Sequence, residues 1–326
     1  NYIISLGSFC KWLSSEAEKV GVEIYPGFAA SDIIFKENSL KGIITSDLGI
    51  EKEGKPGPNF QPGIEIHSKY TLFAEGCRGH LGKKLIDQFK LNENSQHQTY
   101  GIGLKELWEI KPENSKPGEV MHSFGWPLDY ETYGGSFMYH LSQNLLSVGF
   151  VIGLDYQNPY LSPYDEFQQF KTHPKIKNIF KGGRRISYGA RALNEGGWQS
   201  LPKLSFPGGA LIGCEAGTLN TPKIKGSHTA MKSGMIGAEE VFKELSNGKE
   251  NTELINFQDE FKKSWAGAEL KKARNFRPSF KFGLKIGMLL SGFDQIILRG
   301  KAPWTLSHSS PDHLSLKKKN QSKKID

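Results

Sequence analysis

Cysteine is scarce in this sequence of 326 residues, and its spacing excludes several kinds of site. The three cysteines, Cys10, Cys77 and Cys214, stand too far apart to form a C-x-x-C pair. A structural zinc site, a disulfide framework and a self-contained iron–sulfur centre are therefore not expected. The nine histidines include no H-x-x-x-H pair, so we predict no metal site within this chain.

Familiar catalytic motifs are absent as well. No G-x-S-x-G sequence occurs, which leaves serine hydrolase chemistry without support. No G-x-G-x-x-G sequence occurs either, so the main pyrophosphate loop of any bound dinucleotide would lie outside this chain. Residues 49–55 match part of a phosphate-binding loop, but Pro56 stands where a magnesium-binding hydroxyl is needed. A surface hairpin is the favoured interpretation of this segment.

The sequence also lacks the uninterrupted apolar run of about 20 residues that a membrane-spanning helix needs. Its most apolar segment, residues 276–298, is interrupted by Lys281, Lys285 and Asp294. This pattern predicts either a buried amphipathic helix or a segment lying in a membrane interface, with its basic residues toward anionic lipid. We expect the interfacial arrangement, in which the apolar residues that enter the lipid are Phe280, Phe282, Leu284, Ile286, Leu289, Leu290, Phe293 and Ile297.

Positive charge is concentrated near the C-terminus. Residues 261–326 hold 15 Lys and Arg and 4 Asp and Glu, a net +11, whereas the other 27 basic and 30 acidic residues give −3. Such asymmetry indicates an anionic partner surface, either nucleic acid or lipid headgroups. Because the basic residues lack an aromatic stacking platform or a known reader motif, we expect a membrane surface and no nucleic acid.

The two ends of the sequence carry no targeting signal. Asn1 and Tyr2 lead directly into a helical pattern that Gly21 ends, with no signal peptide or transit segment. Residues 317–324 are lysine-rich, as is typical of a solvated tail or linker. We interpret the chain as an internal piece of a longer protein.

Hydrophobic patterns divide the chain into three blocks. In the first, short strands are predicted at residues 22–25, 30–35, 42–45 and 69–74, and a helix then runs to about residue 89. In the second, aromatic-rich alternating runs between residues 100 and 191 predict an antiparallel sheet with one covered face. Within that block, Ser162 followed by Pro163 predicts a helix start. In the third, a strand at 210–213 precedes helices over 227–246 and about 252–275.

The order of the blocks predicts an α/β fold, α+β overall, in which one α/β domain is split by an inserted antiparallel sheet. A strand, a Gly-bearing turn and a helix occur in both outer blocks, as in a nucleotide-binding layer. We predict four regions, namely the first half of the α/β domain at 1–98, the inserted sheet at 99–204, the second half at 205–275, and an interfacial segment with a basic tail at 276–326.

The loop over residues 213–226 is the strongest candidate for cofactor chemistry. It is rich in small residues and leads into a predicted helix, whose free N-terminal amides attract negative charge. Small side chains also let a flat ring lie against the backbone. A plain strand–helix connection is an equally good interpretation of this loop on physical grounds alone.

Several long strings closely resemble the electron-transfer flavoprotein–ubiquinone oxidoreductase family. They are AEGCRGHLGK (74–83), QTYGIGLKELWEI (98–110), GWPLDYETYGGSFMYHL (125–141), GFVIGLDYQNPYLSPYDEFQ (149–168), the segment from ISYGARALNEGG to SHTAMKSG (186–234) and LRGKAPWTL (298–306). The resemblance extends over essentially the whole chain.

The resemblance implies an enzyme that takes electrons from reduced electron-transfer flavoprotein and passes them to ubiquinone. It implies FAD, and a 4Fe-4S cluster whose ligands are absent from this chain, because the family's N-terminal dinucleotide loop and C-terminal cysteine domain are both missing here. It further implies a monomeric, monotopic protein on a quinone-containing inner membrane, either the bacterial cytoplasmic or the mitochondrial inner membrane. The split α/β domain would then bind FAD and the inserted sheet ubiquinone.

Site residues follow from the same resemblance. The residues implied to bind FAD are Ala30, Glu75, Gly76, Gly79, Gly213, Cys214, Gly217, Asn220, Lys225, Gly226, Ser227 and His228. The paired glycines Gly134 and Gly135 are implied to meet the quinone headgroup, where bare backbone admits a flat ring. No side chain is expected to act as a nucleophile, because the electrons move through the cofactor.

Two other functions stay open at this point. One is a geranylgeranyl-reductase-like flavoprotein that acts on a lipid alkene with the same kind of FAD fold. The other is a non-catalytic, basic module that binds a membrane. The strings GGSFMYHL and DYQNPYLSPYDEFQ favour the quinone enzyme over the first.

Overall fold

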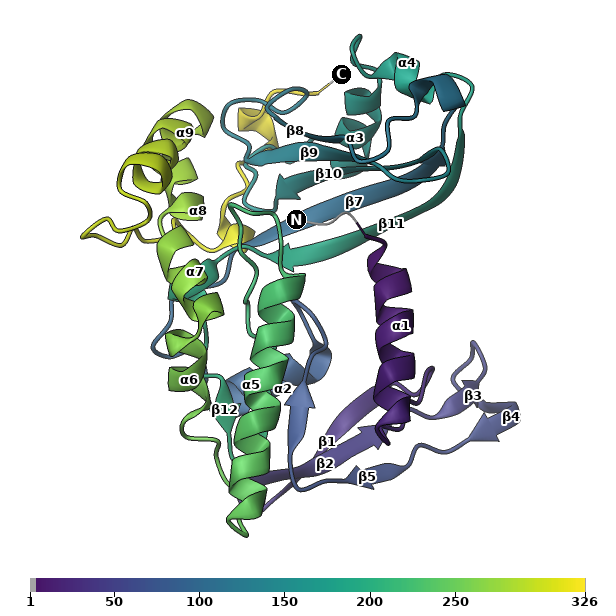
Figure 1. The fold of residues 1–326 in the computed structure, drawn as a ribbon, viewed down its shortest axis with the longest axis vertical. Helices are drawn as coiled ribbons and strands as arrows, with labels where there is room; N and C mark the ends of the chain where they lie inside the picture. The colour runs from purple at the N-terminus through teal and green to yellow at the C-terminus, as the bar shows by residue number, and fades with distance from the viewer. Residues whose placement is uncertain (1–3, 326) are drawn as a thin grey trace.

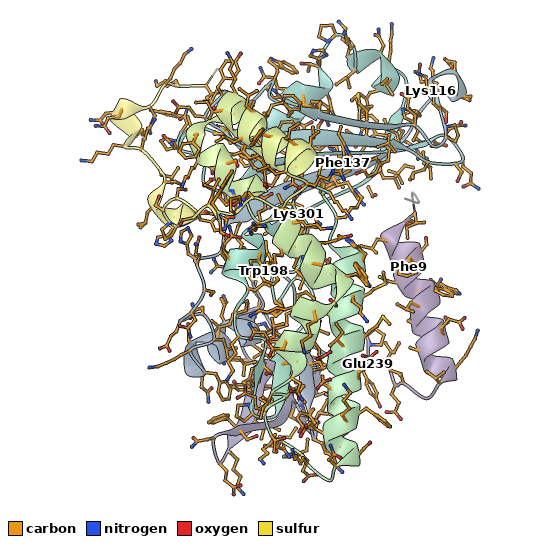
Figure 2. The ribbon with its side chains drawn as sticks, turned by 60° about the vertical axis from the view of Figure 1, so that its left-hand side comes forward. Phe9, Lys116, Phe137, Trp198, Glu239 and Lys301 are labelled. Carbon is orange, nitrogen blue, oxygen red and sulfur yellow. The ribbon has the colours of Figure 1, made fainter. Side chains whose placement is uncertain are left out.

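The computed structural model describes residues 4–325. One end of its long axis is formed by an antiparallel sheet, and the other by smaller sheets and long helices (Figure 1). The helices are α1 Leu6–Lys19, α2 His80–Gln88, α3 Pro163–Lys171, α4 Lys177–Phe180, α5 Ser227–Ser246, α6 Phe257–Lys263, α7 Trp265–Ala273, α8 Phe276–Ser279 and α9 Leu284–Gly292. In two views α1 lies to one side of the body, and it buries none of its residues (Figures 1 and 2).

Five strands form the large sheet in the order β11-β7-β10-β9-β8, with every neighbouring pair antiparallel. They are β7 Tyr100–Glu109, β8 Val120–Phe124, β9 Gly134–His140, β10 Leu145–Gly153 and β11 Arg184–Asn194. Helix α3 covers one face, where Phe150 packs on Phe167 and Phe170. The side chain of Ser162 caps this helix, as the sequence predicts. The alternating pattern therefore places one face of the sheet in a core and leaves the other available.

The rest of the chain forms three small sheets. Strand β6 (Thr71–Phe73) pairs in parallel with β13 (Gly209–Leu211), to which β12 (Ser205–Phe206) adds. A second sheet contains β1 Ala30–Lys36, β2 Ser39–Thr45 and β5 Glu65–His67, and β3 Leu48–Ile50 pairs with β4 Pro56–Gln61 as a hairpin. Because β6 and β13 flank the large sheet in sequence, their pairing joins the two outer blocks around one core.

Most predicted elements are confirmed, and two are wrong. Residues 22–25 are not a strand. The predicted helix over 252–275 starts only at Phe257 and breaks at Ser264, whose hydroxyl accepts from the Gly267 N–H and so begins a new helix. Residues 49–55 lie in the β3–β4 hairpin, as favoured. The boundaries between the four predicted regions stay predictions.

The apolar segment after residue 275 is a series of short helical turns. A 3₁₀ turn, Phe280–Phe282, separates α8 from α9, and a π-helical turn, Phe293–Ile297, follows. Gly283, at a φ of 84°, interrupts the helical conformation between the 3₁₀ turn and α9. Within residues 4–325, no helix combines the length and the apolar character needed to cross a bilayer. The expectation of a lipid-facing Leu284 is wrong, because this side chain is buried.

Candidate functional site

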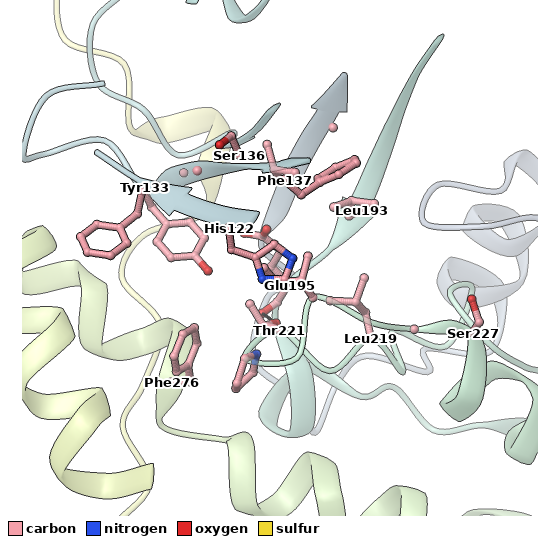
Figure 3. A pocket seen from close by; sticks show the side chains of 18 of the residues that line it. His122, Tyr133, Ser136, Phe137, Leu193, Glu195, Leu219, Thr221, Ser227 and Phe276 are labelled. Carbon is pink, nitrogen blue, oxygen red and sulfur yellow. Dashed lines mark hydrogen bonds between the residues drawn. The ribbon is translucent and has the colours of Figure 1, made fainter. Parts of the chain in front are cut away.

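A cavity of about 1100 Å³ lies between the large sheet and the elements below it (Figure 3). Its walls come from α1, from the loop that leads into α5, and from the segment containing α8 and α9. The lining includes Gly134 and Gly135, implied to meet quinone, together with Cys214, Gly226 and Ser227, implied to bind FAD. One space thus joins two stretches of chain that the sequence assigns to two different ligands.

Glycine leaves part of the cavity face of the sheet without side chains. Paired residues across strands share a face, and one such row runs through Phe124, Gly135, Val151, Gly103 and Arg191. The next row on the same face contains two further glycines, in the order His122, Phe137, Gly149, Lys105 and Gly189. The ring of Phe137 lies across Gly149, where an added Cβ would stand 2.2 Å from it. Gly103 and Gly135 leave the backbone uncovered near the centre of this face, and both line the cavity.

The opposite face explains why the sheet tolerates these glycines. Met138, Val148, Phe150 and Ile152 alternate with the cavity-facing positions and are buried in the core against α3. Burial of such side chains contributes roughly 1.5–3 kcal/mol each. The sheet is therefore held by one face and left free to receive a ligand on the other.

Gly134 and Gly135 are also required by strand packing. A Cβ at Gly134 would stand 2.5 Å from both Leu128 Cδ1 and the Val151 carbonyl oxygen, and one at Gly135 would stand 2.3 Å from the Ser123 carbonyl oxygen. Larger residues at either position would disturb the sheet itself. Both glycines line the cavity, but strand packing alone explains why these two positions require glycine.

The loop before α5 presents backbone rather than side chains to the cavity. Gly213 adopts a φ of 60° and its N–H donates to Ser233 Oγ over 2.8 Å, so that the chain turns tightly over Ala230. Helix α5 begins after Gly226 without a side-chain cap, which leaves its first amides free of intrahelical partners. Burial raises the pKa of Cys214, so its thiol stays neutral beside these amides.

Three other residues of the predicted FAD loop form hydrogen bonds with side chains of other elements of the protein. Asn220 Nδ2 donates to Glu269 Oε2 over 3.2 Å, and His228 Nε2 lies 3.0 Å from the same oxygen. Burial acts to raise the pKa of Glu269, but hydrogen bonds from Lys223 and His228 outweigh it and lower that pKa. Lys225 Nζ instead donates to Tyr139 Oη on β9, over 3.1 Å. These contacts fix the loop against α7 and the sheet.

The predicted turn at residues 75–79 lies outside the cavity lining. Glu75 Oε2 accepts from the Gly82 N–H over 2.8 Å at the start of α2, and Arg191 lies against Gly76. Arg191 also lines the cavity, so it connects the turn to that space. Of the other predicted FAD residues, Ala30 packs on the core around β6 and β13, and Gly217 lies against Gln98. Neither lines the cavity.

A buried ion-pair network fixes the C-terminal segment to the cavity floor. Arg277 of α8 donates to Glu195 Oε2 over 3.0 Å and to Asp155 Oδ1 over 2.8 Å, and its guanidinium stacks on Tyr133. Gly153 makes room for the guanidinium, since a Cβ there would lie 2.9 Å from an Arg277 nitrogen. Burial raises the pKa of Glu195, although the Arg277 charge opposes the rise.

The residues around the cavity fit a flavin. The bare floor accepts a flat apolar ring, and the uncapped start of α5 offers N–H donors of the kind that a polar ring edge requires. Ser227 and Ala230 are small, and both line the cavity (Figure 3).

The fold itself is one found among flavin-dependent enzymes. A geranylgeranyl bacteriochlorophyll reductase-like protein from Thermoplasma acidophilum matches 93% of this chain and 68% of its own with a TM-score of 0.66 at 14% identity. The flavin-dependent brominase Bmp2 matches 90% and 67% at a TM-score of 0.59 and 18% identity.

Sequence comparison narrows this class to one family. Residues 100–193 match the family described as "ETF-QO, ubiquinone-binding". The chain is 54% identical to electron transfer flavoprotein-ubiquinone oxidoreductase from Oryza sativa and 53% identical to that from Homo sapiens, over 96% and 97% of its length. It is 53% identical to the Pseudomonas aeruginosa protein over 100% of its length. It spans 54%, 53% and 60% of these relatives. The expected resemblance is confirmed: over the part that it spans, the chain is a homologue of electron transfer flavoprotein-ubiquinone oxidoreductase.

Sequence reasoning missed most of the cavity floor. Gly103 and its neighbours Val151 and Phe137 line the cavity and were not singled out, although glycine in a strand is a readable signal. Helix α1 was not expected to contribute, yet Phe9 and three of its neighbours line the cavity. No local pattern could have placed α1 there, because the contact joins distant parts of the chain.

Proposed function

We propose that this chain forms the flavin- and quinone-binding part of a membrane-associated oxidoreductase that passes electrons from reduced electron-transfer flavoprotein, through FAD, to ubiquinone. The observation that carries the proposal is the single cavity shared by the loop before α5 and the glycine-rich sheet face. A 4Fe-4S cluster, which the resemblance implies, would take its ligands from outside this chain.

In this proposal FAD supplies the redox chemistry that no side chain can provide. Gly213, Cys214, Gly226 and Ser227 would form the surface that holds the flavin ring, and the free amides at the start of α5 would stabilise negative charge on it. Glu269 keeps those amides in place through its hydrogen bonds to Asn220. The apolar lining keeps water away from both rings.

The quinone in turn lies on the sheet face around Gly135 and Gly103. Its isoprenoid tail leaves between residues of the C-terminal segment, because Leu284, Met288 and Ile296 line the cavity while neighbours of theirs are exposed. Ile296 belongs to both sets, since it lines the cavity and is 75% exposed. The cavity therefore opens beside an apolar surface.

That apolar surface is proposed to be the membrane contact. Its exposed side chains are Phe282, Ile286, Met288, Leu289, Leu290, Phe293, Ile296 and Ile297. Lys281 lies over the ring of Phe282 and Lys285 over that of Tyr130, where both charges could meet anionic headgroups. Phe280 packs between Tyr133 and Phe276 and supports the surface from below.

Filling the sheet face tests the quinone site. A Cβ at Gly103 would meet only ordinary contacts, 3.6 Å from the Arg191 carbonyl oxygen and 3.7 Å from Val151 Cγ2. Gly103→Val should leave the flavin bound and lower affinity for a short-chain ubiquinone by about tenfold or more, because it fills the space of roughly two methyl groups. Quinone affinity and flavin absorbance of the purified full-length protein are the measurements.

Gly189→Val is the matched control. Gly189 lies on the same sheet face, but a Cβ there has no atom within 4 Å, and it does not line the cavity. Equal quinone affinity in the two variants would contradict the proposed placement.

A further inference from the structure

His122 stands at the open edge of the cavity floor. Strand β8 pairs with β9 so that His122 is opposite Phe137, and Phe124 is opposite Gly135. Residues two apart on a strand share a face and lie about 7 Å apart. The His122 side chain therefore lies next to that of Phe124, the residue directly opposite Gly135. It lines the cavity and is also exposed to solvent (Figure 3).

Two further polar groups continue from this histidine toward solvent. His122 Nε2 lies 2.9 Å from Tyr139 Oη, and Lys225 Nζ lies 3.1 Å from the same oxygen. An ammonium group can only donate, so Tyr139 Oη accepts from Lys225, and its own hydrogen is available for a hydrogen bond to Nε2. Lys225 is exposed. The three side chains thus connect the cavity to water.

In the tautomer that accepts the Tyr139 hydrogen at Nε2, the neutral imidazole of His122 carries its own hydrogen on Nδ1. Nε2 is occupied as an acceptor, and no other residue among 4–325 forms a hydrogen bond with Nδ1. Partial burial and the charge of Lys225 lower the pKa of His122. The resting arrangement therefore leaves one N–H free to meet a ligand.

Other ionisable groups in the lining are unsuited to moving a proton near neutral pH. Glu195 is held in its ion pair with Arg277, and burial raises the pKa values of Cys214 and Tyr133. Among the described lining residues, only His122 ordinarily titrates close to neutrality.

We propose that His122, Tyr139 and Lys225 form a proton relay that protonates a quinone during its reduction in this cavity. The proposal rests on the proposed function, which supplies the two electrons. As a quinone oxygen gains electrons, its new O–H bond forms and the Nδ1–H bond of His122 breaks. Nε2 takes the proton of Tyr139, the tyrosine oxygen takes one from the Lys225 ammonium, and Lys225 recovers a proton from water. The imidazole now carries its hydrogen on Nε2, so it returns to the Nδ1–H form by proton exchange with water, to which it is exposed, before a second passage supplies the second proton of the quinol.

The test uses His122→Ala in the full-length, flavin-loaded protein. The rate of quinone reduction in a single turnover should fall on the order of 100-fold, the usual size of a general-acid contribution. Imidazole added to the buffer should restore part of that rate. Affinity for short-chain ubiquinone, measured by equilibrium dialysis, should change less than twofold. Tyr139→Phe should slow the same step without responding to imidazole.

His67→Ala is the matched control, because His67 is an exposed histidine bonded to Glu65 on β5, outside the cavity lining. If His122→Ala reduces quinone as fast as the unmodified protein, the relay is wrong while the proposed function stands. A slow variant that imidazole does not rescue, with quinone affinity lost, shows a structural role and also overturns the relay. An unmodified protein that reduces no quinone removes the proposed function and the relay together.

Discussion

At the scale of single residues, the most unusual group is the Glu215 carboxyl. It is buried against Gly79 and Gly82 at the start of α2, where Glu75 already accepts from the backbone. Burial and the nearby Glu75 charge raise the pKa of Glu215 from 4.5 to about 7. Both glycines are needed there, because a Cβ at either would overlap the Glu215 side chain.

This carboxyl should make stability depend on pH. The unfolded chain releases the Glu215 proton near pH 4.5 and the folded chain only near 7, so the free energy of unfolding falls as pH rises through that window. Each unit of the pKa difference corresponds to about 1.4 kcal/mol. Glu215→Gln should therefore gain stability over the unmodified protein at pH 8, and the gain should shrink toward pH 5.

Urea denaturation at several pH values measures this difference, with the exposed Glu51→Gln as control. A pH-independent difference between Glu215→Gln and the unmodified protein would show that Glu215 ionises normally in the fold.

At the scale of elements, the segment containing α8 depends on one buried arginine. Arg277 connects that segment to Glu195, which directly follows β11, and to Asp155, which lies just after β10. Removing one partner of a buried ion pair leaves an uncompensated charge, which costs more than the pair contributes. The segment that lines the cavity and carries the exposed apolar side chains is thus fixed by electrostatics as well as packing.

Arg277→Ala should lower the free energy of unfolding by about 3–5 kcal/mol, because it leaves Glu195 buried without a counter-charge. Arg184→Ala is the comparison, since Arg184 pairs with Glu109 over 3.0 Å on the exposed surface. That exposed pair should contribute about 0–1 kcal/mol. Denaturant titrations of both variants decide, and similar losses would contradict a special role for the buried pair.

At the scale of the whole molecule, the cavity mouth and the exposed apolar surface belong to the same segment. Leu289 and Ile296 are each 75% exposed, and Leu284 and Met288, earlier in the same segment, line the cavity. A lipid-soluble substrate could pass from a bilayer into such a cavity without crossing water.

The double variant Leu289→Ser with Ile296→Ser should bind phospholipid vesicles at least about tenfold more weakly, because each side chain loses roughly 1.5–3 kcal/mol of apolar burial. Vesicle sedimentation measures the effect. Ile255→Ser, at a position 79% exposed but on another part of the molecule, should bind as the unmodified protein does. Unchanged binding of the double variant would remove the membrane contact from this surface.

Local patterns predicted much of the fold. The Ser162 cap, the α5 helix over residues 227–246 and the alternating strands of the middle block were predicted from neighbouring residues, because their spacing and capping chemistry are local. The break at Ser264 escaped prediction because Gly267 packs against backbone of the preceding helix, a contact of 2.4–2.7 Å for an added Cβ. The burial of Leu284 was not predicted, because a position that faces lipid and a position that faces a cavity both require an apolar residue.

The sequence by itself determined the family, since long strings of residues carry an evolutionary record that needs no coordinates. It also determined the kinds of element and the uneven charge, because helix caps, strand alternation and composition are properties of neighbouring residues. Only the tertiary structure decided that glycines from the separate strands β7 and β9 line one cavity, that Arg277 meets Glu195, and that His122 reaches Lys225 through Tyr139. Those contacts join residues far apart along the chain, and only packing in three dimensions brings them together.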